Sequence, residues 1–205
     1  MGEPRVVPLT ADRADETGLA LAAGFHDDPL FSHLFPRASN RAATLYSLMR
    51  AEARASAKLG VGYVAIDDGQ VLGASLWTEP GKKRSLGHQV REALSGWRAL
   101  AQPRGAFDGI RIVLATDARR PNTRHRYLGV LAVDPSAQGR GVGRALIAVG
   151  LRSSDEDGDV TYLETAKQDN LAWYSRFGFE EIEELRPVAS RPPVWVMSRE
   201  PRPAG

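Results

Sequence analysis

Cysteine is absent from this chain of 205 residues. Without thiols the chain can form no disulfide, no thiolate metal site and no cysteine acyl-enzyme. Lysine is scarce as well, with 4 residues against 23 arginines, and the net charge at pH 7 is only +2. So small a charge gives no reason to expect nucleic acid as a partner.

Long apolar runs are also missing. No stretch is long and apolar enough to predict a membrane-spanning helix, and residues 1–9 lack the apolar core of a signal peptide. We therefore predict a cytoplasmic protein without a membrane partner. The four histidines are not spaced like metal ligands and no Gly-x-Ser-x-Gly motif occurs, so we predict no metal and no serine nucleophile.

The composition that remains is typical of a globular protein, with 42% hydrophobic and 25% charged residues. A chain of this length can bury a substantial core, and we predict one domain over residues 1–205. Residues 200–205 are expected to form a frayed tail.

Residues 127–178 are the most informative stretch. The apolar run 127–133 is short and is closed by Asp134-Pro135, which predicts a buried strand. Glycines follow at 139, 141 and 143, and apolar residues then recur at helical spacing, so a helix should begin within the glycine segment. Glycines permit close backbone approach, and a helix start offers unpaired N–H groups. The segment therefore predicts a pyrophosphate-binding site.

Two other phosphate-binding motifs fit the segment less well. A P-loop needs Gly-Lys-Ser/Thr, whereas Arg144 follows Gly143 here. A dinucleotide-binding unit would use Glu164, which ends the next apolar run, to bind a ribose, and this alternative stays open. Against it, the glycines follow Gly-x-Gly-x-Gly, and Pro135 lies between the strand and the first glycine.

The glycine segment resembles the coenzyme A loop of the GNAT acyltransferase superfamily, Gln/Arg-x-x-Gly-x-Gly/Ala after a Val-x-Pro strand end. In this chain the pattern is Val133-Asp134-Pro135-Ser136-Ala137-Gln138-Gly139-Arg140-Gly141-Val142-Gly143. A second block of the superfamily follows at the expected distance. It comprises Tyr162-Leu163-Glu164-Thr165 and Asn170-x-x-x-Tyr174-x-x-x-Gly178-Phe179.

This resemblance implies an α/β (α+β) fold with a mixed, largely antiparallel sheet of about seven strands and helices on both faces. The strand–helix–strand connection predicts a parallel pair, which would be splayed around the coenzyme A site. Acetyl-coenzyme A is implied as the cosubstrate, and a Val133 N–H would stabilise the oxyanion. Arg140 and Arg144 could instead be solvated charges. The expected coenzyme-binding residues are Leu131, Ala132, Val133, Gln138, Gly139, Arg140, Gly141, Val142, Gly143, Arg144 and Asn170.

Two side chains are candidates for catalysis. By resemblance Tyr174 points at the coenzyme sulfur as general acid, and a phenol with a pKa of about 10 is protonated at pH 7. A packed aromatic beside Trp173 is the alternative. Glu164 could take the ammonium proton, directly or through water, although its ordinary pKa of about 4.3 suits this only if burial raises it. Glu164 could also orient the amine or be purely structural.

The acceptor is expected to contact Asp28, Phe31, Trp77 and Glu164. Asp27-Asp28-Pro29 also fits a helix exit followed by a turn, and residues 30–36 predict either a short helix or a pocket wall. Two helices over 86–118, broken at 102–105, are expected to shape the substrate site. They carry Trp97, which we expect in the core.

More loosely, the chain resembles the GNAT branch that contains puromycin N-acetyltransferase, at Phe25–Pro29, Leu76–Pro80, Leu163–Thr165 and Trp195–Arg199. That branch implies direct acetyl transfer, in a ternary complex, to the amine of a small antibiotic or metabolite, and hence antibiotic resistance. Residues 86–118 differ from the branch, so puromycin itself is not predicted. A protein or peptide N-acetyltransferase and a non-catalytic coenzyme A sensor remain as alternatives, and the chain is expected to be a monomer or homodimer.

The rest of the chain predicts ordinary elements. Asp68-Gly69 predicts a hairpin turn, and Leu19 is expected on the buried face of an early helix. Residues 153–159 predict an acidic surface turn. Strands are expected at 5–9, 61–67, 71–78, 160–165, 179–185 and 194–198, and helices at 10–26, 42–59 and 170–178.

Overall fold

The computed structural model describes residues 4–81, 103–121, 123–188 and 192–202. The strands are β1 (Arg5–Pro8), β2 (Gly62–Asp67), β3 (Gln70–Thr78), β4 (His125–Val133), β5 (Val160–Thr165), β6 (Glu180–Leu185) and β7 (Val194–Arg199). The helices are α1 (Ala14–Gly24), α2 (Pro29–Leu34), α3 (Ala38–Leu59), α5 (Pro103–Asp117), α6 (Val142–Asp157) and α7 (Asp169–Ser175), with short 3-10 turns η1 (Ala11–Arg13) and η3 (Pro135–Ala137).

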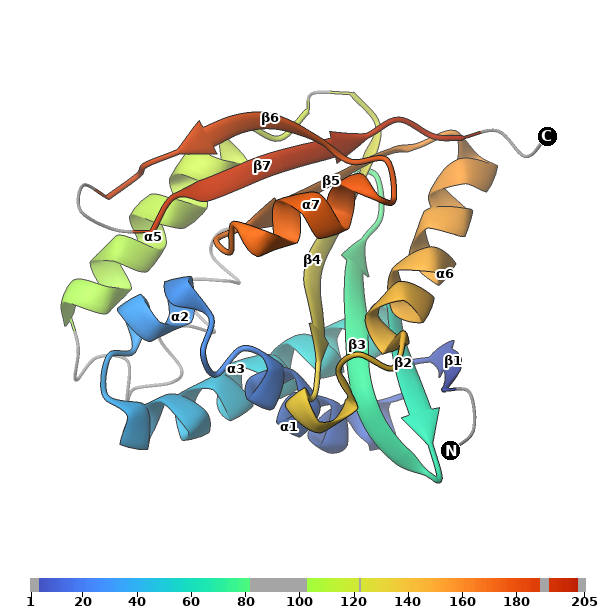
Figure 1. The fold of residues 1–205 in the computed structure, drawn as a ribbon, viewed down its shortest axis with the longest axis horizontal. Coiled ribbons are helices and arrows are strands. Elements are labelled where there is room, and N and C mark those ends of the chain that lie inside the picture. Colours follow the sequence, from blue (N-terminus) through green and yellow to red (C-terminus); the bar gives the residue numbers. More distant parts are fainter. Residues whose placement is uncertain (1–3, 82–102, 122, 189–191, 203–205) are drawn as a thin grey trace.

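The strands form one mixed sheet of seven in the order β1-β2-β3-β4-β5-β7-β6 (Figure 1). Among the strands of the described residues only β4 and β5 pair in parallel, because α6 carries the chain back between them. Their pairing ends at Leu128↔Leu163, whereas β4 continues to Val133 against β3. The two strands therefore separate beyond Leu128, and the predicted fold class is confirmed.

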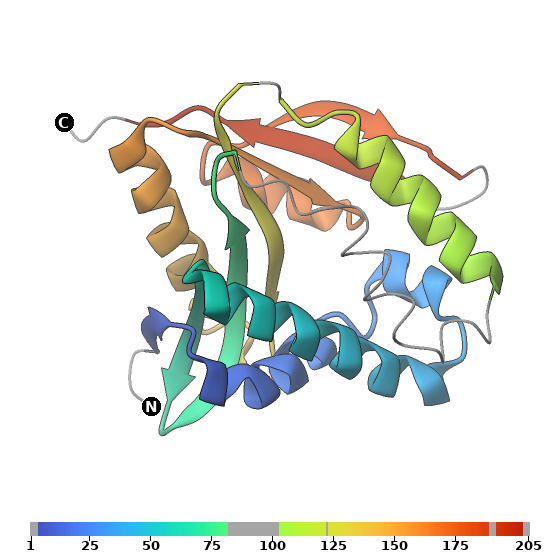
Figure 2. The same cartoon turned by 180° about the vertical axis from the view of Figure 1, so that it is seen from behind.

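Helices cover both faces of the sheet (Figures 1 and 2). On one face, Leu21 of α1 and Met49 of α3 pack with Leu76 of β3. On the other, Ile147 of α6 packs with Leu163 of β5, in the cluster that also contains α7 residues. Helix α5 covers β5 and β7 on the α1 and α3 side, as the view from behind shows (Figure 2). The β4/β5 opening thus lies between two helical layers.

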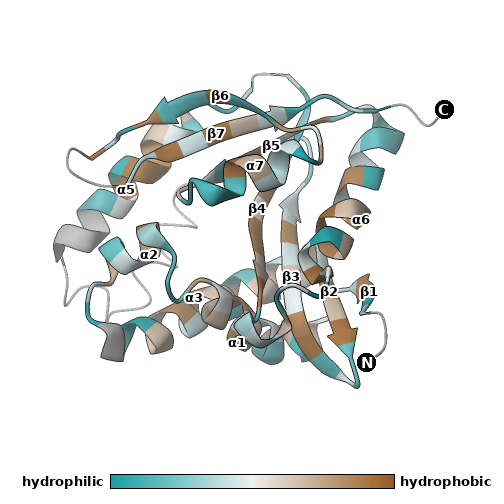
Figure 3. Ribbon diagram, viewed as in Figure 1, coloured by the Kyte–Doolittle hydropathy of each residue, from teal (hydrophilic) through white to brown (hydrophobic). Residues whose placement is uncertain are grey.

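The edge strand β6 differs from the central strands in polarity. Figure 3 shows β4 as mostly apolar and β6 as mostly hydrophilic. Its sequence is Glu-Glu-Ile-Glu-Glu-Leu, with four glutamates. Charge on an edge strand opposes pairing with another sheet, so this edge is protected against aggregation.

Local turn chemistry follows the sequence. Asp68 and Gly69 both have positive φ, 48° and 81°, and join β2 to β3 as the predicted hairpin. Gly60 ends α3 in the left-handed conformation, with φ of 68°. Helix α5 begins at Pro103, so the predicted break at 102–105 is wrong where it overlaps the helix, because proline is tolerated in a first turn. The predicted helix 86–100 and Trp97 lie outside the described residues.

Two sequence-based expectations about burial are wrong. Leu19 is 59% exposed, because α1 packs its small residues against α3. A Cβ on Gly18 would meet the backbone of Arg50 at 2.9 Å, so the two helices are too close for a large side chain between them.

The predicted surface turn at 153–159 is only partly right, because residues 156–158 are exposed whereas Ser154 and Asp159 are buried. Helix α6 extends to Asp157, and Asp159 is fully buried, where it pairs with Arg124 and Arg126. Charge-assisted hydrogen bonds from two guanidinium groups make this burial possible. None of the helices within the described residues combines the length and apolarity that a membrane span needs.

Candidate functional site

The loop that follows β4 is held in a fixed shape. Asp134 accepts hydrogen bonds from the Ser136 N–H at 2.9 Å and the Ser136 hydroxyl at 2.6 Å, and its own N–H donates to the Leu72 carbonyl at 2.8 Å. The Gln138 side chain donates to the Val133 carbonyl at 3.3 Å. These contacts bend the chain from the free end of β4 toward α6.

Two glycines then present the start of α6. Gly139 and Gly141 have φ of 75° and 80°, and a Cβ on either would meet nothing within 4 Å. Glycine is therefore needed for the left-handed backbone and not for lack of space. The structure records main-chain hydrogen bonds donated by Gln138 and Ala145 but, among the described residues, none donated by residues 139–144 between them. This run of free N–H groups at the N-terminus of a 16-residue helix fits an anion such as a diphosphate.

The two arginines of the loop behave differently. Arg140 Nη2 lies 2.5 Å from Asp67 Oδ2 of β2, so its charge is already paired within the protein. Arg144 is exposed, and it forms no ion pair with any of the described residues. Of the two, Arg144 is the cation available to a ligand.

Helix α7 is tied to the end of β5 beside this loop. Asn170 Nδ2 donates to the Thr165 hydroxyl at 2.9 Å, and the Lys167 N–H donates to the same oxygen at 3.3 Å. Trp173 of α7 reaches the first turn of α6, where a Cβ on Gly143 would lie 3.5 Å from its ring. Val133 of β4, Gly143 of α6 and Trp173 of α7 are thus neighbours, while Asn170 is held at the end of β5.

Tyr174 is buried on the α6 and α7 side of the sheet and is 7% exposed. Its ring packs edge-on against Trp173 and Phe179, with centroids 5.0 Å and 5.6 Å away. Burial raises the pKa of Tyr174, and the negative charge of Asp28 raises it further. The phenol is therefore protonated at neutral pH and able to donate.

Asp28 caps α2. Its Oδ1 accepts from the Leu30 and Phe31 N–H groups at 2.9 Å and 3.3 Å. Burial raises the pKa of Asp28, against the lowering effect of these two hydrogen bonds. The residue thus serves as a helix cap, while its charge also acts on the Tyr174 hydroxyl.

Glu164 lies on the other side of β5 from Tyr174, because side chains alternate along a strand and Leu163 packs in the same cluster as Tyr174. The Tyr127 hydroxyl donates to Glu164 Oε2 at 2.5 Å. Oε1 is buried and has no hydrogen-bond partner among the described residues. Burial raises the pKa of Glu164, in the direction a base at neutral pH requires.

Phe31 and Trp77 do not share one pocket. Phe31 is half-buried between Phe25, at a ring distance of 5.2 Å, and Phe35, at 6.4 Å, and it packs against the α1 and α3 cluster. Trp77 belongs to the cluster on the opposite face, and its indole N–H donates to the Ser75 hydroxyl at 3.1 Å. The structure brings Asp28 and Phe31 together on α2 and its cap, and places Trp77 apart from them.

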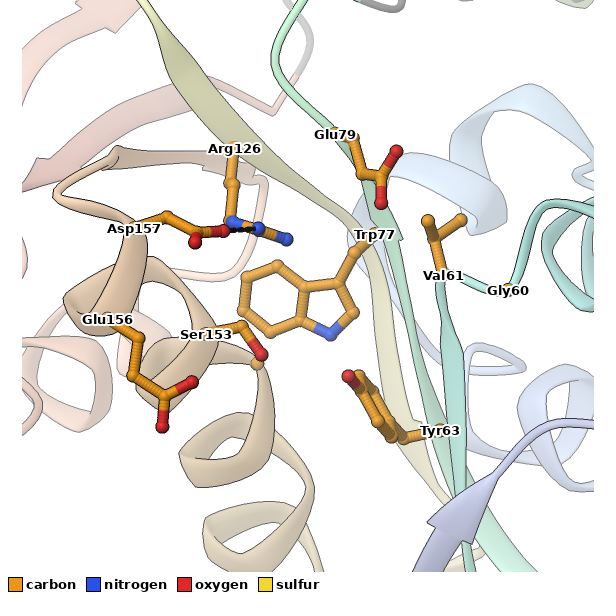
Figure 4. A pocket seen from close by; sticks show the side chains of 10 residues that line it. Gly60, Val61, Tyr63, Trp77, Glu79, Arg126, Ser153, Glu156 and Asp157 are labelled. Atoms are coloured by element: carbon orange, nitrogen blue, oxygen red, sulfur yellow. Dashed lines mark hydrogen bonds and ion pairs between the residues drawn. The ribbon is translucent and has the colours of Figure 1, made fainter.

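Trp77 instead lines a separate cavity of about 220 Å³ beside the C-terminal half of α6 (Figure 4). Tyr63, Glu79 and the Arg126–Asp157 ion pair also face this cavity. None of the predicted coenzyme-binding residues lines this cavity.

Sequence reasoning missed two pairs near the opening. The sequence indicates only that Tyr127 begins a strand, whereas in the structure its hydroxyl donates a hydrogen bond to Glu164. His33 Nε2 lies 2.9 Å from Asp108 Oδ2 and joins α2 to α5. Both contacts depend on which strands and helices are neighbours, so no local motif indicates them. No group of three potential metal ligands occurs among the described residues.

Comparison with known proteins agrees with this geometry. Residues 106–181 match the family model described as an acetyltransferase (GNAT) domain. A Corynebacterium glutamicum structure described as histone acetyltransferase HPA2 and related acetyltransferase aligns with a TM-score of 0.70 and 22% identity, covering 99% of both chains.

Two insect structures are similar in the same way. Arylalkylamine N-acetyltransferase 2 from Aedes aegypti aligns with a TM-score of 0.68 and 14% identity over 97% of this chain and 99% of its own. Polyamine N-acetyltransferase from Drosophila melanogaster gives 0.65 and 16% over 96% and 99%. Residues 106–181 are therefore similar to a GNAT acetyltransferase domain, and the described residues share the fold of these three acetyltransferase structures.

Proposed function

We propose that this protein is an N-acetyltransferase that moves an acetyl group from acetyl-coenzyme A to the amine of a small molecule by direct transfer in a ternary complex. The observation that carries the proposal is the separation of β4 and β5 beyond Leu128, with Tyr174 on one face of the sheet, Glu164 on the other, and unpaired N–H groups in the loop that follows β4. Acetyl-coenzyme A supplies the activated thioester. Groups of the protein would bind the coenzyme, orient the amine and transfer the protons.

The glycine loop fits the diphosphate of the coenzyme. Its N–H groups would bind the phosphate oxygens at the N-terminus of α6, and Arg144 would add a free charge. Beyond Leu128, residues Leu131–Val133 of β4 have no β5 partner. The N–H groups on this open edge would pair with the pantetheine amides and steady the developing oxyanion.

Tyr174 would act as general acid. It is protonated and buried, and its neighbour Trp173 packs against the first turn of α6, so its hydroxyl could hydrogen-bond the departing sulfur and then give up its proton. Glu164 would accept a proton from the acceptor ammonium, directly or through water, and its unpaired Oε1 would orient the nitrogen. The two groups approach the reacting carbon from opposite faces of the sheet, so nucleophile and leaving group need not compete for space.

The acceptor would bind near α2 and α5. Asp28 and Glu164 provide negative charge, and Phe31 provides an apolar wall, a combination that suits a cation with an apolar part. In support, similar structures are described as acting on arylalkylamines and as forming N-acetylagmatine. An amine-bearing antibiotic is a further candidate from the sequence resemblance. Trp77 stays a sequence-based prediction.

The test is acetyl-coenzyme A turnover against a panel of polyamines, agmatine, arylalkylamines, puromycin and a histone peptide. The chain has no cysteine, so a thiol reagent reports only released coenzyme A. We expect turnover with at least one small amine and heat of binding with acetyl-coenzyme A alone. Binding without turnover of any amine would favour a sensor, turnover of the peptide alone would favour a protein acetyltransferase, and absence of binding would refute the proposal.

A further inference from the structure

The geometry points to Tyr127 as a positioning residue that holds Glu164 so that one carboxylate oxygen, Oε1, faces the acceptor amine. This inference rests on the proposed function of Glu164. It adds a residue that the GNAT resemblance does not name, and it begins from the register of the only parallel strand pair in the sheet described here.

The register makes the contact possible. Tyr127 of β4 is the direct neighbour of Tyr162 on β5, and the pairing ends one position later at Leu128↔Leu163. Glu164 is two residues beyond Tyr162 and points to the same face of the sheet. A tyrosine is long enough to reach this diagonal neighbour, and it does so at 2.5 Å.

The two oxygens of Glu164 have different surroundings. Oε2 accepts the Tyr127 hydroxyl, whereas Oε1 is buried and lacks a partner within the described residues. A buried carboxylate oxygen without a donor is costly, and native proteins rarely keep one without a reason. A donor brought by the substrate, the acceptor ammonium, would satisfy it.

The tyrosine is itself held in place. The Arg120 guanidinium lies 4.2 Å from the centroid of the Tyr127 ring, and Arg120 Nη2 lies 3.0 Å from Asp117 Oδ1 one turn earlier. Tyr162 packs against the ring with centroids 5.9 Å apart. Because the ring cannot swing away, the hydroxyl fixes which oxygen of Glu164 is used and which remains free.

Tyr127 does not exchange the proton itself. Burial raises its pKa well above the ordinary value, and the charge of Glu164 raises it further. It therefore stays protonated, and a donor, at neutral pH. Four titratable or charged groups face Glu164: Tyr127, Tyr162, Arg120 and Asp117. Of these, the hydrogen bond from Tyr127 is the largest influence that lowers the pKa of Glu164.

Tyr127→Phe should change both the pKa of Glu164 and the pH dependence of kcat/KM. Removing the hydroxyl removes a hydrogen bond that favours the carboxylate, so the pKa of Glu164 rises. Activity that needs the carboxylate is then lost below a higher pH, and the acid limb of the kcat/KM profile moves up by the same amount. On this acid limb the variant is slower than wild type, and the deficit shrinks as the pH increases.

The experiment compares pH profiles of wild type, Tyr127→Phe and Tyr63→Phe, with the best amine found for wild type. Tyr63 lies in the α6-side cavity of Figure 4 and has no recorded hydrogen bond to the site, so its variant should match wild type. A Tyr127→Phe profile that superimposes on wild type would overturn the inference. So would a uniform loss at all pH values, because a merely structural role predicts that pattern.

A second readout separates this inference from the proposed function. Carbon-13 NMR of the Glu164 carboxyl, assigned by its absence in Glu164→Gln, follows the titration without any substrate. We expect the Glu164 titration to move to higher pH in Tyr127→Phe even if no acceptor is turned over. An unmoved titration would refute the inference, whereas failure to turn over any amine would refute only the proposed function.

Discussion

Asn170 of α7 donates a hydrogen bond of 2.9 Å to the hydroxyl of Thr165 at the end of β5. This contact fixes the first turn of α7, and with it Tyr174, relative to the strand. The same Asn170 was predicted from the sequence to contact the coenzyme. The two roles make different predictions, and one pair of variants distinguishes them.

Asn170→Ala and Thr165→Val both remove this hydrogen bond and should reduce kcat. Asn170→Ala should lower the free energy of unfolding by about 1 kcal/mol, and Thr165→Val by more, because it also removes the acceptor of the Lys167 N–H. If Asn170 also binds the coenzyme, only Asn170→Ala should raise the Kd for coenzyme A. Thermal denaturation and calorimetric titration measure both quantities. Equal Kd values for the two variants would assign Asn170 a positioning role alone.

Gly141→Ala tests the phosphate-binding loop. Alanine at a φ of 80° is strained by about 1–2 kcal/mol, and the loop should rearrange and weaken coenzyme A binding roughly tenfold. Gly60→Ala is the matched control, since Gly60 also has a left-handed φ, of 68°, and open space around its Cβ position. Both variants should be destabilised alike. Weakened binding in both, or in neither, would show that the loop does not bind the coenzyme.

Tyr174→Phe tests the general acid. We expect kcat to fall about 100-fold while coenzyme A binding is retained. Because burial and then Asp28 raise the pKa of Tyr174, the wild-type tyrosine should titrate above an ordinary tyrosine. Asp28→Asn keeps a helix cap but removes the charge, so the Tyr174 titration should move to lower pH. Ultraviolet titration, with Tyr174→Phe as the blank, measures this; no movement would mean that the two groups do not interact.

Much of the fold was predictable because its signals are local. The Asp68-Gly69 hairpin, the Gly60 helix end and the glycine loop each follow from residues whose backbone preference is strong. The strand–helix–strand unit around α6 gave the parallel pair, since such a connection cannot join antiparallel neighbours directly.

What could not be predicted depends on distant neighbours. The Tyr127–Glu164 hydrogen bond needs the exact register of β4 on β5, which no single segment contains. Likewise Asp159 looks like a surface residue until Arg124 and Arg126 are placed beside it. Leu19 was assigned to the wrong face because the α1 and α3 contact uses glycine and alanine, and a hydrophobic pattern underweights such small residues.

Two helical glycines should respond to alanine with opposite signs. Gly150 of α6 lies against the Trp77 indole, and a Cβ there would overlap the ring, so Gly150→Ala should destabilise the protein by about 1–3 kcal/mol. At Gly109 of α5 a Cβ would meet Leu34 at an ordinary 3.8 Å, so Gly109→Ala should stabilise by about 0.5–1 kcal/mol. Melting temperatures should move down and up respectively, and a shift of the same sign in both would contradict the packing at Trp77.

Glu164→Gln should lower the activity and raise the stability of the protein near pH 7. Burial raises the folded-state pKa of Glu164, so the folded state binds its proton more tightly than the unfolded chain does. The contribution of Glu164 to wild-type stability is therefore most favourable at low pH and declines as the pH rises from the unfolded pKa, about 4.3, through the folded value. Glutamine cannot ionise and avoids this decline. The variant should melt at a higher temperature than wild type near pH 7, and this advantage should vanish near pH 4, while kcat falls about 100-fold.

Glu183→Gln on β6 is the control of opposite sign. The hydrogen bond from Arg119 lowers the pKa of Glu183, so that carboxylate favours folding above its unfolded pKa and the benefit is lost as the pH falls. Its glutamine variant should be slightly less stable at pH 7 and fully active. If Glu164→Gln also proved less stable at pH 7, the buried carboxylate would be a net stabilising group. In that case Glu164 Oε1 would need a hydrogen-bond donor within the protein, and the proposal that the acceptor amine is its donor would be wrong.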